Sequence, residues 1–466
     1  MNKKHSKFIA AILLTVLSFL VNLEAKDRPN IIFIFADDWG WGDLSCHDHP
    51  YVKTPNIDRL AKEGTDFQRF TVASGVCSPS RTAIVTGHFP ARYGISGHFA
   101  WPNDNARRNM PDWLSPNAAL LPRMLQEAGY ATAHYGKWHL ANNMIPDSPL
   151  AGEYGYDEFG TFNSAGEQMP VHDDVRLANK FIEKNHKAGK PFFINLWMHE
   201  SHTPFHTVPK YRWRFPDLPE KDNIYASVLS HADDRVGELL DTLDRLNISR
   251  NTLVIFSSDN GPARASKEGD LKLQHDTATG AGYGINAAKG ITGGRRGYKA
   301  SLFEGGIGVP FLARWPGKIA ANTIDNTSLM SAVDILPTFC ELANAKLPAR
   351  YKPDGVSQVT TLLGKAFTER KKPLFWKAMS PWPAQGSKPD HWPAYVIVKD
   401  NWKLVANIHN DHVQLFDITK DVNEDNDLKD QHPEVVAKLQ KSITKWQKTL
   451  PKKPDSTCFS KHRTKK

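Results

Sequence analysis

Cys77 is the residue of this chain whose chemical setting most needs an explanation. It lies in the stretch GVCSPSRTAIVTGH, residues 75–88, just ahead of Pro79, Arg81 and a short helical run that Gly87 should end. The usual fate of a free cysteine is burial as a small apolar group. Two chemical roles are also open to it: a thiolate nucleophile assisted by a histidine, or a position at a helix N-terminus whose free N–H groups hold an anion.

Two pairs of side chains with oxygen donors follow apolar runs. IIFIFADD ends on Asp37 and Asp38, and TLVIFSSDNG ends on Asp259 and Asn260. Carboxylate and amide oxygens are the ligands of a hard cation such as calcium or magnesium, whereas a transition-metal site would include histidine or cysteine. Either pair alone is more typical of a turn or a helix cap. Together, at the ends of two strands, they predict a cation site.

Basic side chains follow two further apolar runs. YGKWHL places Lys137 and His139 two residues apart, and FFINLWMHESH runs into His199 and His202. If the strand before Lys137 continues, Lys137 and His139 lie on the same face. A cation beside an imidazole suits an anionic substrate; a surface lysine and a structural histidine are the alternative.

The elements that must position these residues alternate between short apolar runs and helical patterns. This alternation predicts an α/β fold, with a large mixed, mainly parallel sheet between helices on both faces. Ligands of such sheets bind beyond the carboxyl ends of the strands, where the polar residues above are expected to meet. We expect strands at 30–35, 131–135, 191–198, 252–257 and 309–314, and helices at 55–63, 80–86, 117–128, 172–187 and 224–246.

The pattern changes from about residue 350, which predicts a second, smaller unit. AYVIVKDNWKLVAN and VQLFDI read as two alternating strands, and a helix is expected near residues 433–449. We therefore divide the chain into a signal peptide, residues 1–25, a catalytic domain, 26–350, an α+β subdomain with a small antiparallel sheet, 351–451, and a basic tail, 452–466, expected to be a solvated end.

The first 25 residues have the features of a secretory signal peptide. Lysines at positions 3, 4 and 7 precede an apolar core, and Ala25 is a small residue suited to cleavage. A membrane anchor is the alternative, but the apolar run is shorter than the roughly 20 residues that a bilayer requires. We expect export to the periplasm or the outside, and no membrane association after cleavage.

The net charge and the cysteine content argue against nucleic-acid-binding, zinc-cluster and disulfide-rich proteins. The net charge of +9 falls to +7 without the signal peptide, and the tail holds +5 of it, so the body of the chain is nearly neutral and no nucleic-acid partner is expected. The cysteines, Cys46, Cys77, Cys340 and Cys458, are too few and too scattered for a zinc cluster or a disulfide framework. One disulfide between unspecified partners is possible.

The motif around Cys77 resembles the signature of a known family. CSPSRTAIVTG, a Cys-x-Pro-x-Arg followed by Thr-Gly, is similar to the signature of the type I formylglycine-dependent sulfatases of the alkaline phosphatase-like superfamily. ADDWGWGD, GKWHL, SHTPF, SSDNG and GYKASLFEGGIGVPFLARWPG resemble further sulfatase blocks in the family's order, over about residues 29–318. Gly308 departs from the family, which often has arginine there, and we expect an effect on loop packing or substrate contact.

The resemblance implies a post-translational modification and a metal. A separate maturation enzyme would oxidise Cys77 to formylglycine, whose hydrate attacks sulfur and then expels sulfate. One Ca²⁺, with Mg²⁺ as the second choice, would be held by Asp37, Asp38, Asp259, Asn260 and the modified Cys77.

The resemblance also implies catalytic roles. Arg81 would steady the hydrate and the carboxylates, and His139 would orient formylglycine and assist sulfate release. Lys137, His202 and Lys299 would bind sulfate oxygens, and His202 or Lys299 would protonate the leaving alcohol. His202 is preferred to its neighbours His199 and His206 because it belongs to SHTPF, and Lys299 is preferred to Arg295 and Arg296 because it precedes Glu304 by five positions.

The expected substrate is a sulfated carbohydrate. The overall similarity is greatest to sulfatases of glycosaminoglycans and other sulfated polysaccharides, especially N-acetylgalactosamine-6-sulfatases and other arylsulfatase-type enzymes. Loops 96–113, 261–276 and 380–395 combine aromatic and basic residues that can contact sugars. The alternatives are a phosphate or phosphonate ester hydrolase of the same superfamily and a non-catalytic binder of sulfated glycans.

Overall fold

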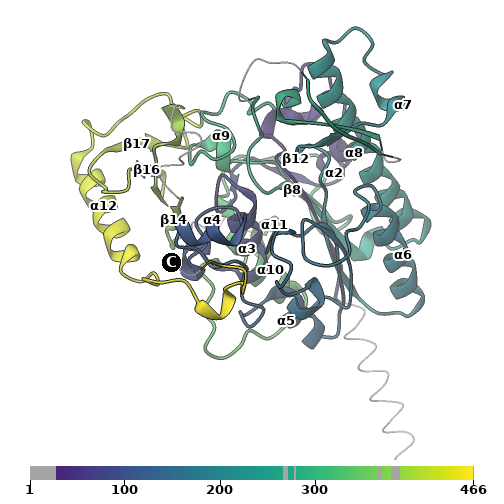
Figure 1. The fold of residues 1–466 in the computed structure, drawn as a ribbon, viewed down its shortest axis with the longest axis horizontal. Helices are drawn as coiled ribbons and strands as arrows, with labels where there is room; N and C mark the ends of the chain where they lie inside the picture. The colour runs from purple at the N-terminus through teal and green to yellow at the C-terminus, as the bar shows by residue number, and fades with distance from the viewer. Residues whose placement is uncertain (1–27, 266–270, 278–279, 366–369, 379–388, 465–466) are drawn as a thin grey trace, which may run out of the picture.

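The computed structural model describes residues 28–265, 271–277, 280–365, 370–378 and 389–464 (Figure 1). The expected signal peptide lies outside the described residues. Among those described, no helix has the length and apolar content that crossing a bilayer requires.

An eight-stranded sheet forms the centre of the structure. Strand β11 is antiparallel to its neighbours β2 and β8, and the remaining neighbouring pairs are parallel, which confirms the mainly parallel sheet predicted from the sequence. In spatial order the strands are β12 (Thr323–Asp325), β2 (Thr65–Phe67), β11 (Phe311–Arg314), β8 (Thr252–Ser258), β1 (Asn30–Ala36), β6 (Phe192–Trp197), β4 (Ala131–Lys137) and β5 (Glu158–Phe162).

Helices cover both faces of this sheet (Figure 1). Strand β1 shows why: alternate side chains such as Phe33 and Ile34 belong to two different apolar cores, and both are fully buried. One core includes residues of α3 (Cys77–Thr86), α5 (Leu121–Glu127) and α10 (Ile335–Leu342). The other includes residues of α2 (Pro55–Lys62), α6 (Asp174–Lys187) and α8 (Glu220–Arg245).

Shorter elements complete the larger part of the chain. Two small sheets are formed by β3 (Phe70–Thr71) with β13 (Met330–Ser331), and by β7 (Phe205–His206), β10 (Gly280–Tyr283) and β9 (Leu273–Thr277). The short α-helices are α4 (Pro102–Arg107), α7 (Pro209–Arg212), α9 (Glu304–Ile307) and α11 (Val359–Leu362). Short 3-10 helices are Trp41–Asp43, Ser45–His47, Pro90–Tyr93, Ala151–Tyr154, Ser249–Asn251, Ile285–Ala287, Ala332–Asp334, Pro389–His391 and Ser456–Cys458.

A four-stranded antiparallel sheet and helix α12 (Pro433–Gln447) follow, as predicted. One detail of the prediction was wrong, because AYVIVKDNWKLVAN is a hairpin of two strands and not one strand. Asp400 adopts a positive φ of 57° in the turn, a conformation that Asp tolerates. The strands are β14 (Leu374–Lys377), β15 (Tyr395–Lys399), β16 (Trp402–Ala406) and β17 (Val413–Asp417).

Buried contacts join this small sheet to the larger part of the chain. Lys403 is fully buried, and its Nζ lies 2.8 Å from Glu304 and 2.9 Å from Glu424. Trp376 Nε1 donates a hydrogen bond of 2.7 Å to the carbonyl oxygen of Val72. The division of the chain near residue 350 stays a prediction.

The basic C-terminal segment is exposed at Lys452, Lys453 and Lys461, as its composition suggested, but other residues in it pack against the body of the chain. Cys458 is buried, and its carbonyl oxygen accepts a hydrogen bond of 2.8 Å from the backbone N–H of Asp112. The N–H of Ser460 donates to the Asp112 carboxylate at 2.8 Å. The four cysteines are free thiols, so the possible disulfide is absent.

His134 on β4 makes a testable contribution to stability. It lies fully buried against the edges of Trp138, Tyr156 and Trp197. Burial, and to a smaller extent the charge of Arg81, lowers the pKa of His134 from 6.5 to about 3. Because the folded state resists protonation, this stability is present above pH 6.5 and is lost as the pH falls below that value.

We therefore expect His134→Gln to make the free energy of unfolding less dependent on pH. Between pH 7.5 and 5.5, wild type should lose about 1.4 kcal/mol more of its free energy of unfolding than the variant, measured by urea denaturation. The same exchange at the exposed His409 is the control and should leave the pH dependence unchanged. Identical pH profiles for His134→Gln and wild type would contradict the prediction.

Candidate functional site

The two pairs of oxygen donors meet, as predicted, at the carboxyl ends of neighbouring parallel strands. Asp37 and Asp38 follow β1, and Asp259 and Asn260 follow β8, which pairs with β1 along its whole length. All four side chains are fully buried. The backbone N–H of Asp38 donates to Asp259 Oδ1 at 3.1 Å, and Asn260 Nδ2 donates to Asp38 Oδ1 at 2.6 Å.

Cys77 is the first residue of α3, and Gly87 ends this helix in the left-handed conformation with φ 61°. The Cys77 side chain is 2% exposed, and its Sγ lies 3.6 Å from Asp37 Oδ1. Burial, followed by the charge of Asp259, raises the pKa of the Cys77 thiol above its usual range. Without a bound cation this environment disfavours a thiolate, whereas a divalent cation at the neighbouring carboxylates would favour it.

Arg81, one turn further along α3, connects two parts of the site. Its Nη2 and Nε donate to Asp259 Oδ2 at 2.6 and 3.0 Å, and its Nη1 donates to the carbonyl oxygen of Lys137 at 3.2 Å. The guanidinium is fully buried and lies 4.8 Å from the ring centroid of Trp197. Arg81 therefore holds the end of β8 against the end of β4.

Two lysines contact the aspartates on β1. Lys137 Nζ lies 2.6 Å from Asp37 Oδ2 and 3.5 Å from Cys77 Sγ, and Lys299 Nζ lies 2.6 Å from Asp38 Oδ2. Burial raises the pKa of Asp37, but its interactions with His202, Lys137 and Arg81 hold it well below its usual range. Asp37 is therefore ionised at neutral pH. Burial lowers the pKa of His202 itself well below its usual value.

Asp38 and Asp259 show the electrostatic character of a cation site. Burial raises the pKa of Asp38 in spite of Lys299, and burial with the nearby Asp37 raises the pKa of Asp259 to about 6 in spite of Arg81. Carboxylates crowded in this way are stabilised by a bound cation. Among the described residues, Asn260 Oδ1 is buried and has no hydrogen-bond partner, so one further oxygen ligand is free. The residues present fit a hard cation.

The histidines near the aspartates differ in their contacts. His202 Nδ1 and Nε2 lie 3.9 Å from Asp37 and 3.8 Å from Asp38, and ligand atoms of Asp37, Asp38, Cys77 and His202 all lie within 4.8 Å of one another. His199, expected only as pocket wall or surface, also approaches Asp37, with Nδ1 3.5 Å from the carboxylate. His206 lies on β7, outside the cavity described below.

His139 lies at the site, but not because β4 continues past Lys137 as the sequence suggested. Strand β4 ends at Lys137, and His139 has a positive φ of 51°, so alternation along a continuing strand does not place it. Its Nε2 lies 3.1 Å from the carbonyl oxygen of Phe99. Burial, and next the charge of Lys137, lowers the pKa of His139 well below its usual range, so the imidazole is neutral.

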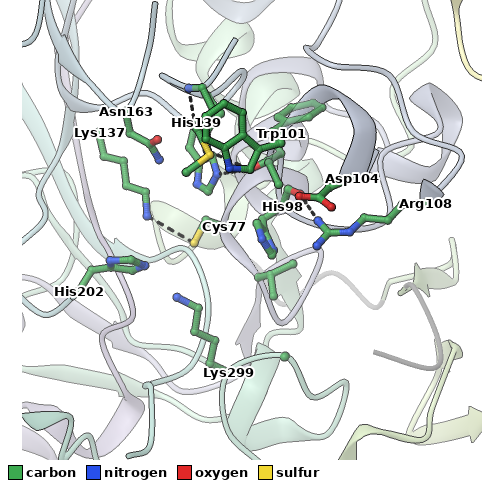
Figure 2. Close-up of a pocket in the computed structure, with 16 residues that line it drawn as sticks. Cys77, His98, Trp101, Asp104, Arg108, Lys137, His139, Asn163, His202 and Lys299 are labelled. Carbon is green, nitrogen blue, oxygen red and sulfur yellow. Dashed lines mark hydrogen bonds between the residues drawn. The ribbon is translucent and has the colours of Figure 1, made fainter. Parts of the chain in front are cut away.

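A cavity of about 450 Å³ opens above Cys77. Figure 2 shows the Cys77 sulfur between Lys137, His202 and Lys299, whereas Trp101, Asp104 and Arg108 lie at the other side. The site residues predicted from the sequence that line this cavity are Cys77, Lys137, His139, His202 and Lys299. The other lining residues are Val76, His98, Phe99, Ala100, Trp101, Asp104, Arg108, Asn142, Met144, Asn163 and Ala300.

Of the three loops expected to contact sugars, 96–113 lines this cavity. Parts of the other two, residues 266–270 and 380–388, lie outside the described residues. Arg264 and Ala265 line a separate cavity with Lys289 and Tyr298.

Two questions raised by the sequence are resolved by packing. A Cβ atom on Gly308 would lie 2.6 Å from Arg295 Nη1 and 2.7 Å from Glu304 Oε2, so an arginine does not fit there without rearrangement. The departure at Gly308 therefore concerns loop packing. Arg295 lies over the ring of Trp41 and Arg296 pairs with Asp390, away from the cavity that Lys299 lines.

Comparison with known proteins assigns this arrangement to a family. The family model described as Sulfatase matches residues 29–345, and the one described as N-sulphoglucosamine sulphohydrolase, C-terminal, matches residues 296–449. The chain belongs to the sulfatase family. This sulfatase is therefore a sulfuric ester hydrolase, and its family implies a metal ion and a formylglycine residue in general.

Individual relatives cover most of this sulfatase. An N-acetylgalactosamine-6-sulfatase of Mus musculus is 33% identical over an alignment of 402 residues, which covers 78% of this chain and 72% of the relative. An N-acetylgalactosamine-6-O-sulfatase of Bacteroides thetaiotaomicron is 27% identical over 90% of this chain and 93% of the relative. A structure from work on glycosaminoglycan metabolism by Bacteroides thetaiotaomicron is 25% identical, with a TM-score of 0.72 over 91% of this chain and all of that chain.

Proposed function

We propose that this sulfatase removes sulfate esters from the sugars of sulfated polysaccharides such as glycosaminoglycans, with formylglycine made from Cys77 and one Ca²⁺. The observation that carries the proposal is the cavity of about 450 Å³ with two chemically different ends. At the inner end, Lys137, His202 and Lys299 surround Cys77; at the outer end lie an aromatic ring and charged groups suited to a sugar (Figure 2).

Asp37, Asp38, Asp259 and Asn260, together with the modified Cys77, would hold the metal. A bound divalent cation neutralises a sulfate oxygen and lowers the pKa of an attacking hydroxyl. Calcium is preferred to magnesium because it accepts several protein oxygens at once, whereas magnesium usually keeps several waters.

Formylglycine, once hydrated, supplies two hydroxyl groups on one carbon, one to attack sulfur and one to expel sulfate and restore the aldehyde. The chain contributes the surroundings of this group. Arg81 fixes Asp259 beside it, and the neutral His139 would orient it and assist sulfate release. The small distance between Cys77 Sγ and Lys137 Nζ, 3.5 Å, supports a role for Lys137 close to the reacting atoms.

Lys137, His202 and Lys299 would bind the remaining sulfate oxygens. Their polar atoms enter the inner end of the cavity from three different segments of the chain, so a sulfate group would be surrounded rather than held from one side (Figure 2). Preorganised positive groups stabilise the charge that moves onto sulfate and the leaving oxygen. His202 or Lys299 would protonate the leaving alcohol.

The outer end of the cavity supports a carbohydrate substrate. Trp101 is 58% exposed and can stack against a sugar ring, and Arg108 can meet a carboxylate or a second sulfate. The relatives named N-acetylgalactosamine-6-sulfatase make N-acetylgalactosamine 6-sulfate the first sugar to test.

The proposal includes export and maturation. Residues 1–25 would direct the chain to the periplasm or the outside, with cleavage after Ala25, and a formylglycine-generating enzyme would read the CSPSR segment. Residues 26–350 would form the catalytic domain, 351–451 the subdomain that supports it, and 452–466 the basic C-terminal segment.

The test is sulfate release by protein that is co-expressed with a maturation enzyme and supplied with Ca²⁺. The panel contains 6-sulfates and 4-sulfates of N-acetylgalactosamine, the 6-sulfates of N-acetylglucosamine and galactose, a fucose sulfate, and the matching phosphate esters. We expect release from a sulfated sugar at a rate at least about a hundredfold above that from its phosphate analogue. Phosphate release alone would favour a phosphohydrolase, and tight binding without release would favour a glycan binder.

A further inference from the structure

The C-terminal segment lies across two loops that form walls of the Cys77 cavity. In Figure 1 this segment, yellow, ends beside α4. The first loop, residues 98–112, contains α4 and supplies Trp101, Asp104 and Arg108 to the cavity. The second loop, residues 138–148, supplies His139, Asn142 and Met144.

Arg463 anchors the first loop through a buried carboxylate. Its Nε and Nη2 donate to the two oxygens of Asp112 at 2.5 and 3.0 Å, and Asp112 is fully buried. Asp112 Oδ1 also accepts a hydrogen bond of 3.0 Å from Asn105 Nδ2. Asn105 in turn exchanges two hydrogen bonds of 3.0 Å with the backbone of Ala100, the residue before Trp101. A continuous polar path therefore joins Arg463 to the outer end of the cavity.

Asp147 connects the same segment to the second loop. Its carboxylate accepts a hydrogen bond of 2.7 Å from Ser460 Oγ and one of 2.9 Å from the backbone N–H of Lys461. The backbone N–H of Ser460 donates at 2.8 Å to Asp112. Ser460 thus bridges both loops with two atoms of one residue.

The inner end of the cavity is held by other contacts. Arg81 and Lys137 join the ends of β8, β1 and β4 through Asp259 and Asp37, without any atom of the C-terminal segment. His139 lies at the start of the second loop, two residues after Lys137, whereas Asp147 lies near its end. Loosening the loops through the C-terminal segment should therefore change the binding of the sugar more than the binding of sulfate.

We infer that residues 455–464 form a C-terminal clamp that fixes the two walls of the sugar end of the cavity, with Arg463 as a positioning residue for sugar recognition. The inference rests on the proposed function, because it assigns the outer end of the cavity to a sugar. Arg463 touches neither the substrate nor the reacting atoms; it acts through Asp112 and Asn105.

The experiment compares two substrates in fully matured, Ca²⁺-loaded enzyme: the sulfated sugar that wild type hydrolyses fastest, and 4-nitrophenyl sulfate, which contains no sugar. Arg463→Ala should raise KM for the sugar about tenfold, the effect of one lost positioning interaction, with kcat changed less than twofold. Both parameters for the aryl sulfate should stay within twofold. Arg463→Lys should recover part of the sugar KM, because lysine keeps the charge without the bidentate geometry.

Asp147→Ala tests the second loop and does not depend on Arg463. It should raise KM for the sugar in the same selective way. The control is Lys453→Ala, which removes an exposed positive charge from the same segment and should leave both substrates unaffected.

Equal losses on the two substrates, or an unchanged sugar KM in both Arg463→Ala and Asp147→Ala, would overturn the clamp. If Arg463→Ala does not fold, Asp147→Ala decides alone. Failure of the proposed function would be visible earlier and separately, because wild type would then release sulfate from none of the sugars.

Discussion

Cys77→Ser, matured and assayed like wild type, should lose sustained sulfate release, with turnover reduced at least about a thousandfold. Serine offers one hydroxyl group, which can receive the sulfuryl group but has no second hydroxyl on the same carbon to expel it. The burial of residue 77, 2% exposed, also restricts attack by water. Sulfate release over many turnovers measures the loss, and the mass of the intact chain should increase by one SO₃ group.

The matched control for this variant is Cys46→Ser. Cys46 is exposed and does not line the cavity, so the same exchange should change turnover less than twofold. Wild-type turnover by Cys77→Ser would exclude formylglycine chemistry at this position. A thiolate mechanism predicts a loss in this variant too, but it predicts no SO₃ adduct.

The positions of the metal-side residues could be predicted from sequence because they depend on local patterns. Apolar runs such as residues 30–36 and 252–258 fold as buried parallel strands, and the residues after them must appear at one edge of the sheet. Asp37 and Asp259 are therefore placed by the strands themselves. The end of α3 was predictable for a similar reason, since Gly87 can adopt the left-handed conformation that ends it, but the helix begins at Cys77 and not at residue 80 as predicted.

Other features depend on contacts between distant segments. Nothing near residue 311 indicates that β11 runs antiparallel to β8, and the positive φ of His139 has no local signature. The approach of His199 to Asp37 depends on how the chain turns after β6. Arg463 and Asp112 are 351 positions apart, so the composition of the tail suggested a solvated end and gave no sign of the ion pair between the partly buried Arg463 and the buried Asp112. By contrast, the KDNW turn that divides β15 from β16 was detectable, because Asp-Asn is a frequent turn pair.

Asp259→Asn should deprive the protein of its metal. Asp259 Oδ2 neutralises the fully buried Arg81, and Oδ1 faces the backbone of Asp38. Asparagine keeps an oxygen but removes the negative charge, so Asp37, 3.4 Å from Arg81 Nη2, would be the carboxylate left to balance the guanidinium and would be less available to a cation. We expect metal affinity to fall at least about a hundredfold. Elemental analysis after dialysis should then find little metal, whereas wild type retains about one ion per chain.

Asp233→Asn separates this effect from the general cost of changing a buried carboxylate. Asp233 is 1% exposed and accepts hydrogen bonds from the backbone N–H groups of Asn56 and Ile57 at 3.1 and 2.8 Å. It does not line the cavity. This control should keep its metal even if it is less stable.

Asp259→Ala, which also removes the oxygen, should lose at least as much metal as Asp259→Asn. Full metal retention by both Asp259 variants would remove Asp259 from the ligand set, and recovery of wild-type activity by Mg²⁺ as well as by Ca²⁺ would contradict the choice of calcium.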